Sequence, residues 1–226
     1  MSKIFIGVGH GGNDSGAVGR DGALEKSLNL SIAKACGAAL QRNGVKVLLS
    51  REKDEPDTVA QEVAECNRFA PDLAVDIHNN AGGGDGAEAY HTKSGGAGKK
   101  LAENILAQLS ALGQKNRGAK TRLNSSGADY YAFIRQTKAP AVIVECAFVD
   151  SADIELIDTE AERTAVGEAI ARGILNTLGI KYSERGSSGS SVTYRVQCGA
   201  YSKRENAEAQ AAKLKAAGFS AIITTA

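Results

Sequence analysis

The chain has 226 residues, of which 42% are hydrophobic and 23% charged, a composition typical of a globular protein with a sizeable core. Its 27 lysines and arginines nearly balance its 26 aspartates and glutamates, so the net charge gives no indication of binding to nucleic acid or to a membrane surface. No apolar stretch is long enough to span a bilayer. The length allows one full domain and a small additional module.

The N-terminal sequence MSKIFIGVG contains an apolar run that is too short for a signal peptide, so we expect the protein to be made in the cytoplasm. The four cysteines lack the CxxC spacing of zinc-thiolate sites; they are Cys36, Cys66, Cys146 and Cys198. The first three lie within helical or strand-like patterns, which favours buried free thiols.

Strand-like and helical patterns alternate along most of the chain. Strands are predicted at Lys3–Val8, Val45–Leu49, Leu73–His78, Ala87–His91 (as a short edge strand), Tyr130–Ile134 and Ala141–Glu145. Helices are predicted at Ala23–Gln41, Thr58–Phe69, Gly98–Leu112 and Ala161–Leu178, and residues 114–128 are predicted to be an exposed loop. The alternation predicts an α/β fold with a mainly parallel twisted sheet and helices on both faces.

The composition changes sharply near residue 181. Residues 1–180 form the predicted main domain, and the Gly/Ser-rich residues 181–192 form a predicted flexible linker. Residues 193–226 have a βαβ pattern, with strand-like segments at Thr193–Ala200 and Ala221–Thr225 around a helix at Lys203–Ala217.

This C-terminal module is very small. Fewer than about 40 residues rarely fold alone, and a split βαβ unit leaves its two strands without the neighbour that should pair between them. We therefore expect two chains to combine their modules into one sheet, which would make a homodimer. The alternatives are a module that docks on its own main domain and one that is poorly ordered.

Four groups with metal or acid–base chemistry are predicted to meet at one edge of the sheet. His10 follows the first strand, His78 ends the third, and Glu145 ends the strand that begins at Ala141. Glu25 lies in the first turn of the helix after the first strand. Because active sites of parallel α/β sheets collect at the carboxyl ends of the strands, we expect these side chains to lie close together.

Two imidazoles and one carboxylate are a common ligand set of catalytic zinc, which keeps a further position for water. Zinc lowers the pKa of such a water to about 7 and polarises a carbonyl group. A second carboxylate is then needed to accept the proton and pass it to the leaving nitrogen, and Glu145 is the candidate for this role.

Each of these residues also has a purely structural interpretation. A single histidine at a strand end is more often simply hydrogen-bonded than a metal ligand. Glu25 could have no other role than to stabilise its helix by a favourable interaction with the helix dipole. Glu145 is different, because a carboxylate that ends an apolar strand is costly to bury without a partner. His91 is assigned a structural role. Asp76 lies on the same strand face as His78, and an ordinary hydrogen-bonding role is favoured for it over a supporting role behind the site.

The sequence GVGHGG, residues 7–12, formally matches the dinucleotide fingerprint GxGxxG. In that fingerprint the helix begins at the third glycine, whereas here a loop of about ten residues precedes the helix at Ala23. The acidic residue expected about 20 residues further on would fall near Ile32, in the middle of the helix. A dinucleotide-dependent enzyme is therefore disfavoured.

Several motifs together resemble one known family. They are HGGNDSGAVG, ALEKSLNLSIA, LSREKD, VAECNRFAPDLAVDIHNNA and FIRQTKAPAVIVECAFVD, and the resemblance spans about residues 3–178. They resemble the zinc-dependent N-acetylmuramoyl-L-alanine amidases of the Amidase_3 type. The resemblance implies hydrolysis of the amide between N-acetylmuramic acid and L-alanine in peptidoglycan. It places His10, Glu25 and His78 at the zinc ligands and Glu145 at the catalytic glutamate.

The chain departs from the family pattern at Asp76, where a small hydroxyl residue is usual, and at Ala147, where glycine is common. No insertion corresponds to the helix that covers the zinc in autoinhibited members, so we expect an open site. The tail resembles the first half of a SPOR-type repeat, which binds peptidoglycan. A phage endolysin or a host autolysin that reaches the wall after release is expected, and a non-catalytic wall-binding protein is disfavoured because all four site residues are present.

Overall fold

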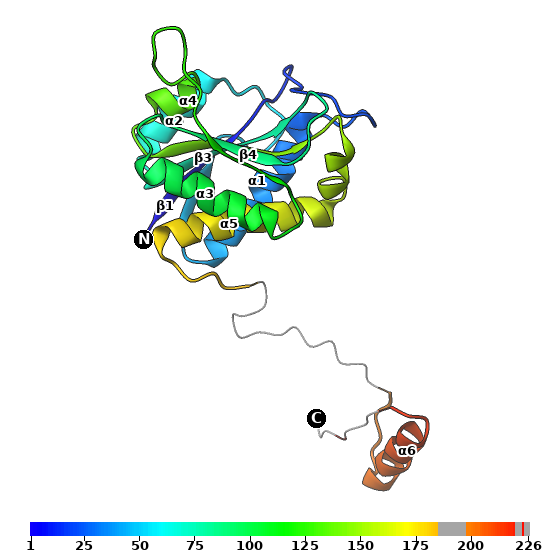
Figure 1. Cartoon of the computed structure of the whole chain (residues 1–226). Helices are drawn as coiled ribbons and strands as arrows, with labels where there is room; N and C mark the ends of the chain where they lie inside the picture. The colour runs from blue at the N-terminus through cyan, green and yellow to red at the C-terminus, as the bar shows by residue number, and fades with distance from the viewer. Residues whose placement is uncertain (185–197, 220–222, 224–226) are drawn as a thin grey trace. The chain divides into compact units, whose positions relative to one another are not determined.

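The computed structural model describes residues 1–184, 198–219 and 223, and the chain divides into two compact units, Met1–Arg185 and Gly186–Ala226 (Figure 1). The predicted linker lies outside the described residues from 185 onward, as do most of the two strand-like segments predicted in the C-terminal module. The helix predicted between them is confirmed as α6, Arg204–Ala216, none of whose residues is buried. The predicted homodimer stays a prediction.

A six-stranded sheet forms the centre of the main unit, in the order β2-β1-β3-β6-β4-β5. Its strands are β1 (Lys3–Val8), β2 (Lys46–Leu49), β3 (Leu73–Asn80), β4 (Ala87–His91), β5 (Asn116–Lys120) and β6 (Ala141–Phe148). Neighbouring strands are parallel except for the antiparallel pair of β4 and β6. The predicted α/β fold with a mainly parallel sheet is confirmed.

Helices cover both faces of the sheet, as predicted. They are α1 (Glu25–Arg42), α2 (Val59–Phe69), α3 (Gly96–Ser110), α4 (Ala132–Gln136) and α5 (Glu160–Leu178), with a 3₁₀ helix, η1, at Ala152–Leu156. Figure 1 shows α3 and α5 on one side of the sheet and α2 and α4 on the other. The larger core lies under α1, α3 and α5, and α1 and α3 both pack against α5.

The core on the α2 and α4 side is much smaller. It consists of residues from the first half of each central strand, such as Phe5, Ala74 and Ile143, packed against Val63 of α2 and Phe133 of α4. Because α2 has 11 residues and α4 only five, this apolar layer is short. Toward the carboxyl ends of the strands the same face carries polar side chains, and it is there that the site lies.

The strand predicted at Ala87–His91 is confirmed as β4, but two other predictions around β4 and β5 are wrong. Ala87–His91 was predicted as an edge strand, but β4 pairs with β5 on one side and β6 on the other. The edge strand on this side of the sheet is β5, which lies within residues 114–128, predicted to be a loop. The sequence NRGAK has no alternating apolar pattern, and an edge strand with no fully buried residue does not need one.

A third prediction is wrong at Tyr130–Ile134, where α4 replaces the expected strand. Aromatic and β-branched residues favoured a strand there, but Phe133 and Ile134 both pack into the smaller core from one helical turn. A five-residue helix is also too short to show a helical period in the sequence.

All four cysteines lie among the described residues and are free; Cys36, Cys66 and Cys146 are buried, as predicted, and Cys198 is exposed. Among the described residues, no helix combines the length and apolarity that a membrane span requires.

Candidate metal site and active site

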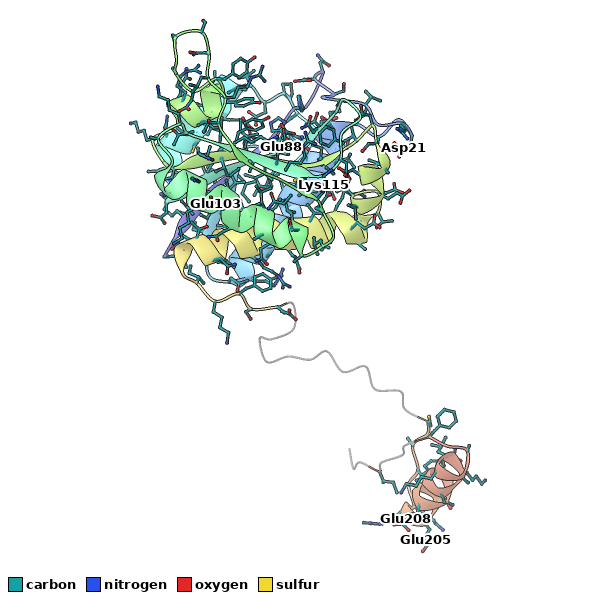
Figure 2. The ribbon with its side chains drawn as sticks, in the orientation of Figure 1. Asp21, Glu88, Glu103, Lys115, Glu205 and Glu208 are labelled. Carbon is teal, nitrogen blue, oxygen red and sulfur yellow. The ribbon has the colours of Figure 1, made fainter. Side chains whose placement is uncertain are left out.

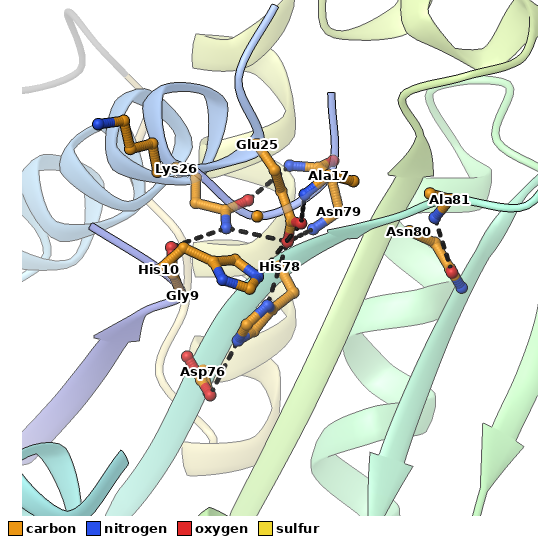
Figure 3. Close-up of polar contacts among 12 residues, drawn as sticks. Gly9, His10, Ala17, Glu25, Lys26, Asp76, His78, Asn79, Asn80 and Ala81 are labelled. Carbon is orange, nitrogen blue, oxygen red and sulfur yellow. Dashed lines mark hydrogen bonds and ion pairs between the residues drawn. The ribbon is translucent and has the colours of Figure 1, made fainter. Parts of the chain in front are cut away.

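The structure brings His10, Glu25 and His78 together at the carboxyl edge of the sheet. One ligand atom from each lies within 4.8 Å of the others (Figure 3). Glu25 is the first residue of α1, and its two oxygens face different imidazoles. Its Oε2 lies 3.2 Å from Nε2 of His10, and its Oε1 lies 3.1 Å from Nδ1 of His78.

The Glu25 carboxylate is fixed by its surroundings. The side chain is only 5% exposed, and it accepts hydrogen bonds from the backbone N–H groups of Ala17 and Asn79 at 2.9 and 3.1 Å. Burial by itself would raise the pKa of Glu25, but the hydrogen bonds to His10 and His78 outweigh it and hold that pKa well below its usual range. Glu25 is therefore an ionised carboxylate between two imidazoles.

Each imidazole has a second carboxylate behind it. Nδ1 of His10 lies 2.8 Å from Oδ2 of Asp14, and Nε2 of His78 lies 3.3 Å from Oδ2 of Asp76. A carboxylate in this position fixes the ring and its tautomer and makes the opposite nitrogen a better ligand. The supporting role considered for Asp76 from the sequence therefore fits its contact with His78.

These carboxylates also affect protonation. The hydrogen bond with Glu25 raises the pKa of His10, with Asp14 adding to it and burial opposing. Burial lowers the pKa of His78, but Asp76 and Glu25 outweigh burial, so the net pKa lies well above 6.5. Without a metal ion the site is therefore a set of ion pairs, and a cation that binds there competes with protons on both rings.

Glycines of the GVGHGG segment make room for side chains of β3. A Cβ at Gly9 would lie 2.2 Å from Cε1 of His78, and a Cβ at Gly7 would lie 2.7 Å from Oδ1 of Asp76. Both β3 side chains thus lie across β1, directly over its backbone. The glycines that resemble a dinucleotide fingerprint serve the packing of the histidine site.

The backbone turns sharply at the end of β1. His10 has a φ of 65°, one of two non-glycine residues with positive φ in the described part of the chain. A left-handed conformation at a non-glycine residue is uncommon and costs free energy, so the surrounding structure must hold it. Here the contacts of the ring with Asp14 and Glu25 supply that support.

Glu145 lies beside this cluster and is not part of it. In the parallel pair of β3 and β6 it is in register with His78, so the two side chains lie on the same face of the sheet. Burial raises the pKa of Glu145 to about 7, while the charge of His78 opposes the rise. Within residues 1–184 the carboxylate of Glu145 has no hydrogen-bond partner, which leaves it available to a substrate or to water.

Two asparagines were not anticipated from the sequence. Nδ2 of Asn29 donates to Oε1 of Glu25 at 3.2 Å, and Nδ2 of Asn79 donates to Oδ1 of Asn29 at 2.8 Å. They tie α1 to β3 directly behind the site. The signal for Asn29 was its position four residues after Glu25, on the same face of the helix.

His91 lies apart from the site, as predicted. It is 6% exposed on β4, and its Nδ1 contacts the carbonyl oxygen of Thr92 at 2.8 Å. The site itself is accessible, because the side chains of His10 and His78 are 25% and 21% exposed.

These features define a class: an α/β protein with a candidate metal site of two histidines and one glutamate, and a separate half-buried carboxylate beside it. Residues 4–176 match the N-acetylmuramoyl-L-alanine amidase family, and residues 190–226 match the SPOR domain. The chain therefore belongs to the N-acetylmuramoyl-L-alanine amidase family and carries a C-terminal SPOR domain.

Individual relatives agree with this assignment. The chain is 35% identical to the N-acetylmuramoyl-L-alanine amidase CwlM of Bacillus licheniformis, over 99% of this chain and 85% of the relative. It is 33% identical to the endolysin of Bacillus phage SPP1, over 83% of this chain and 70% of the endolysin.

A solved structure supports the fold. The catalytic domain of CwlV, an N-acetylmuramoyl-L-alanine amidase from Bacillus (Paenibacillus) polymyxa var. colistinus, aligns with a TM-score of 0.72 at 29% identity. The alignment covers 80% of this chain and all of that domain. The predicted activity, N-acetylmuramoyl-L-alanine amidase action on peptidoglycan, is thus confirmed at the level of the family, and the chain is a cell-wall hydrolase.

Proposed function

We propose that the metal is zinc and that His10, Glu25 and His78 bind it. The observation that carries this proposal is the buried Glu25 carboxylate, which turns one oxygen toward each imidazole. Two imidazoles and one carboxylate are the protein ligands of a common class of catalytic zinc sites. When bound, zinc would lower the pKa of a water molecule to about 7 and polarise the carbonyl of the scissile amide.

We assign the proton transfers to Glu145. As a carboxylate it accepts the proton that the attacking water loses when its oxygen bonds to the amide carbon. As a carboxylic acid it then returns this proton to the nitrogen of L-alanine while the C–N bond breaks. Its place beside His78, outside the ligand cluster, suits a group that must exchange a proton rather than hold a metal.

Removal of the metal tests this proposal. We expect a chelator to abolish the cleavage of purified peptidoglycan, and one equivalent of zinc per chain to restore it. Because zinc binds the folded state, its addition should also raise the melting temperature of the metal-free protein. Unchanged cleavage after the metal content has fallen to a negligible level would contradict the proposal.

The pH dependence of the rate should report Glu145. Only the ionised form accepts a proton, so the rate falls as the pH falls through the pKa of Glu145. Burial raises this pKa from 4.5 to about 7, and a cation in the neighbouring site lowers it again. We therefore expect the acidic limb of kcat against pH to have its midpoint between 4.5 and about 7. A rate that is constant from about pH 4 to about pH 8 would contradict the role of Glu145.

The SPOR domain is a peptidoglycan-binding module, and we propose that it brings the amidase unit to the wall.

We also keep as proposals the release of the protein from the cytoplasm before it acts and the pairing of two C-terminal modules in a homodimer. A mass equal to one chain at high concentration, measured by light scattering, would contradict the homodimer. Relatives include both an endolysin and a bacterial amidase, so both biological roles remain candidates for this chain.

A further inference from the structure

The buried carboxylate Glu88, which is labelled in Figure 2, lies on the central sheet. It is next to Glu145 and on the same face of the sheet. The two residues are directly opposite each other in the antiparallel pair of β4 and β6. Glu88 is only 3% exposed, and its Oε2 accepts hydrogen bonds from Nε of Arg117 at 2.6 Å and from Nζ of Lys120 at 2.5 Å. Its Oε1 accepts from the hydroxyl of Tyr90 at 2.8 Å. The buried carboxylate of Glu88 thus binds the side chains of Arg117 and Lys120, two cations of the edge strand β5.

The surface of this cluster is positively charged. Burial raises the pKa of Glu88, but the hydrogen bonds from Arg117, Lys120 and Tyr90 outweigh burial and hold the pKa at about 2. Two cations against one ionised carboxylate leave a net charge of about +1 at neutral pH. The side chains of Arg117 and Lys120 are 32% and 35% exposed, whereas that of Glu88 is 4% exposed. A ligand that approaches this face therefore meets the cations and not the acid.

Arg117 is held in a fixed position. Its guanidinium lies 4.9 Å from the centre of the Phe148 ring, and its Nη1 donates to the carbonyl oxygen of Asp85 at 3.3 Å. Together with the bond to Glu88 these contacts use two of the five N–H groups of arginine. Within the described part of the chain the other three have no partner, and a preordered guanidinium with free donors is suited to a carboxylate.

The distance from the reacting groups fits a peptide. Strands are about 4.8 Å apart, so β5 lies about 10 Å from Glu145 across β4. An extended peptide advances about 3.3–3.6 Å per residue, so a carboxylate two or three residues beyond the scissile amide would reach the two cations.

We infer that Arg117 and Lys120 form a subsite for a carboxylate of the peptide that extends from L-alanine, with Glu88 as the residue that positions them. The subsite rests on the proposed function, because it takes the reacting amide to lie beside Glu145. It makes the enzyme selective for acidic peptides on the side of the leaving amine.

Two soluble substrates test the subsite with the full-length protein and its metal. Both are N-acetylmuramoyl-L-alanyl peptides, and they differ only in one carboxylate two or three residues beyond the scissile amide. This carboxylate is free in one substrate and converted to the amide in the other. A hydrogen bond to a charged group should favour the acidic substrate by about ten- to a hundredfold in kcat/KM. In Lys120→Met this ratio should fall toward one, mainly through a higher KM for the acidic substrate.

Lys99→Met is the matched control, because Lys99 lies on α3 and pairs with Glu103 of the same helix. It removes the same charge and should keep the wild-type ratio. Equal kcat/KM for the two substrates in the wild type, or a wild-type ratio in Lys120→Met, would contradict the proposed subsite and leave the proposed function unaffected. Full activity of Glu145→Gln on both substrates would instead contradict the proposed function, and the subsite would fall with it.

Discussion

Glu145→Gln is expected to lower the rate of peptidoglycan hydrolysis by about 10²- to 10⁴-fold while the metal content stays at the wild-type level. Glutamine has nearly the same shape as glutamate but cannot accept or return the proton. The three candidate ligands lie on other elements, so the metal site remains complete. The measurements are the rate at which new amino groups appear in purified peptidoglycan and the amount of zinc per chain.

Glu103→Gln is the control for the same chemical change. Its side chain is 57% exposed on α3, on the opposite side of the sheet, and the variant should keep the wild-type rate. A Glu145→Gln enzyme that hydrolyses peptidoglycan at the wild-type rate would refute the proton-transfer role. Loss of both activity and zinc would show that Glu145 acts by holding the site together.

Gly9→Ala is expected to disturb the metal site although it adds a single methyl group. The new Cβ would lie between 2.2 and 2.5 Å from three ring atoms of His78, which is closer than Cβ contacts occur. The ring cannot move freely, because Asp76 and Glu25 hold its two nitrogens. We expect a loss of about 1–3 kcal/mol in the free energy of unfolding and a weaker affinity for zinc.

Gly98→Ala makes the same change where there is room. A Cβ at Gly98 has its nearest neighbour, the carbonyl oxygen of Ala141, at 3.4 Å. Because alanine favours a helix over glycine, this variant should be as stable as the wild type or slightly more stable. Thermal unfolding and zinc titration distinguish the two variants. Wild-type stability and zinc affinity in Gly9→Ala would show that His78 does not need to lie over β1.

The sequence was sufficient to predict that His10, Glu25 and His78 lie together, because they come at strand ends and at a helix start. His10, Glu25 and His78 come from segments with clear periodic patterns, and the rule that active sites lie at the carboxyl edge of parallel sheets brought them together. What could not be predicted were contacts that depend on exact positions. Asp14 behind His10 depends on the left-handed turn at His10, which no propensity indicates.

The cationic subsite could not be predicted from the sequence for a related reason. Arg117 and Lys120 lie in a segment with no apolar alternation, so neither the strand β5 nor the face of its side chains was evident. The pairing of β4 with β5 also shifts register between Ala87 and Ala89, which a sequence pattern cannot show. The pairing of Glu88 on β4 with Glu145 on β6 is what relates these charges to the proposed proton-transfer group, and it is evident only from the structure.

The chemical identity of the fragments released from purified peptidoglycan tests the central claim most directly. With zinc bound, the full-length protein should release fragments with new L-alanine amino termini and no new reducing sugars. After chelation these termini should no longer form. New reducing sugars, or L-alanine termini that form equally well without metal, would contradict an amidase that works through His10, Glu25 and His78.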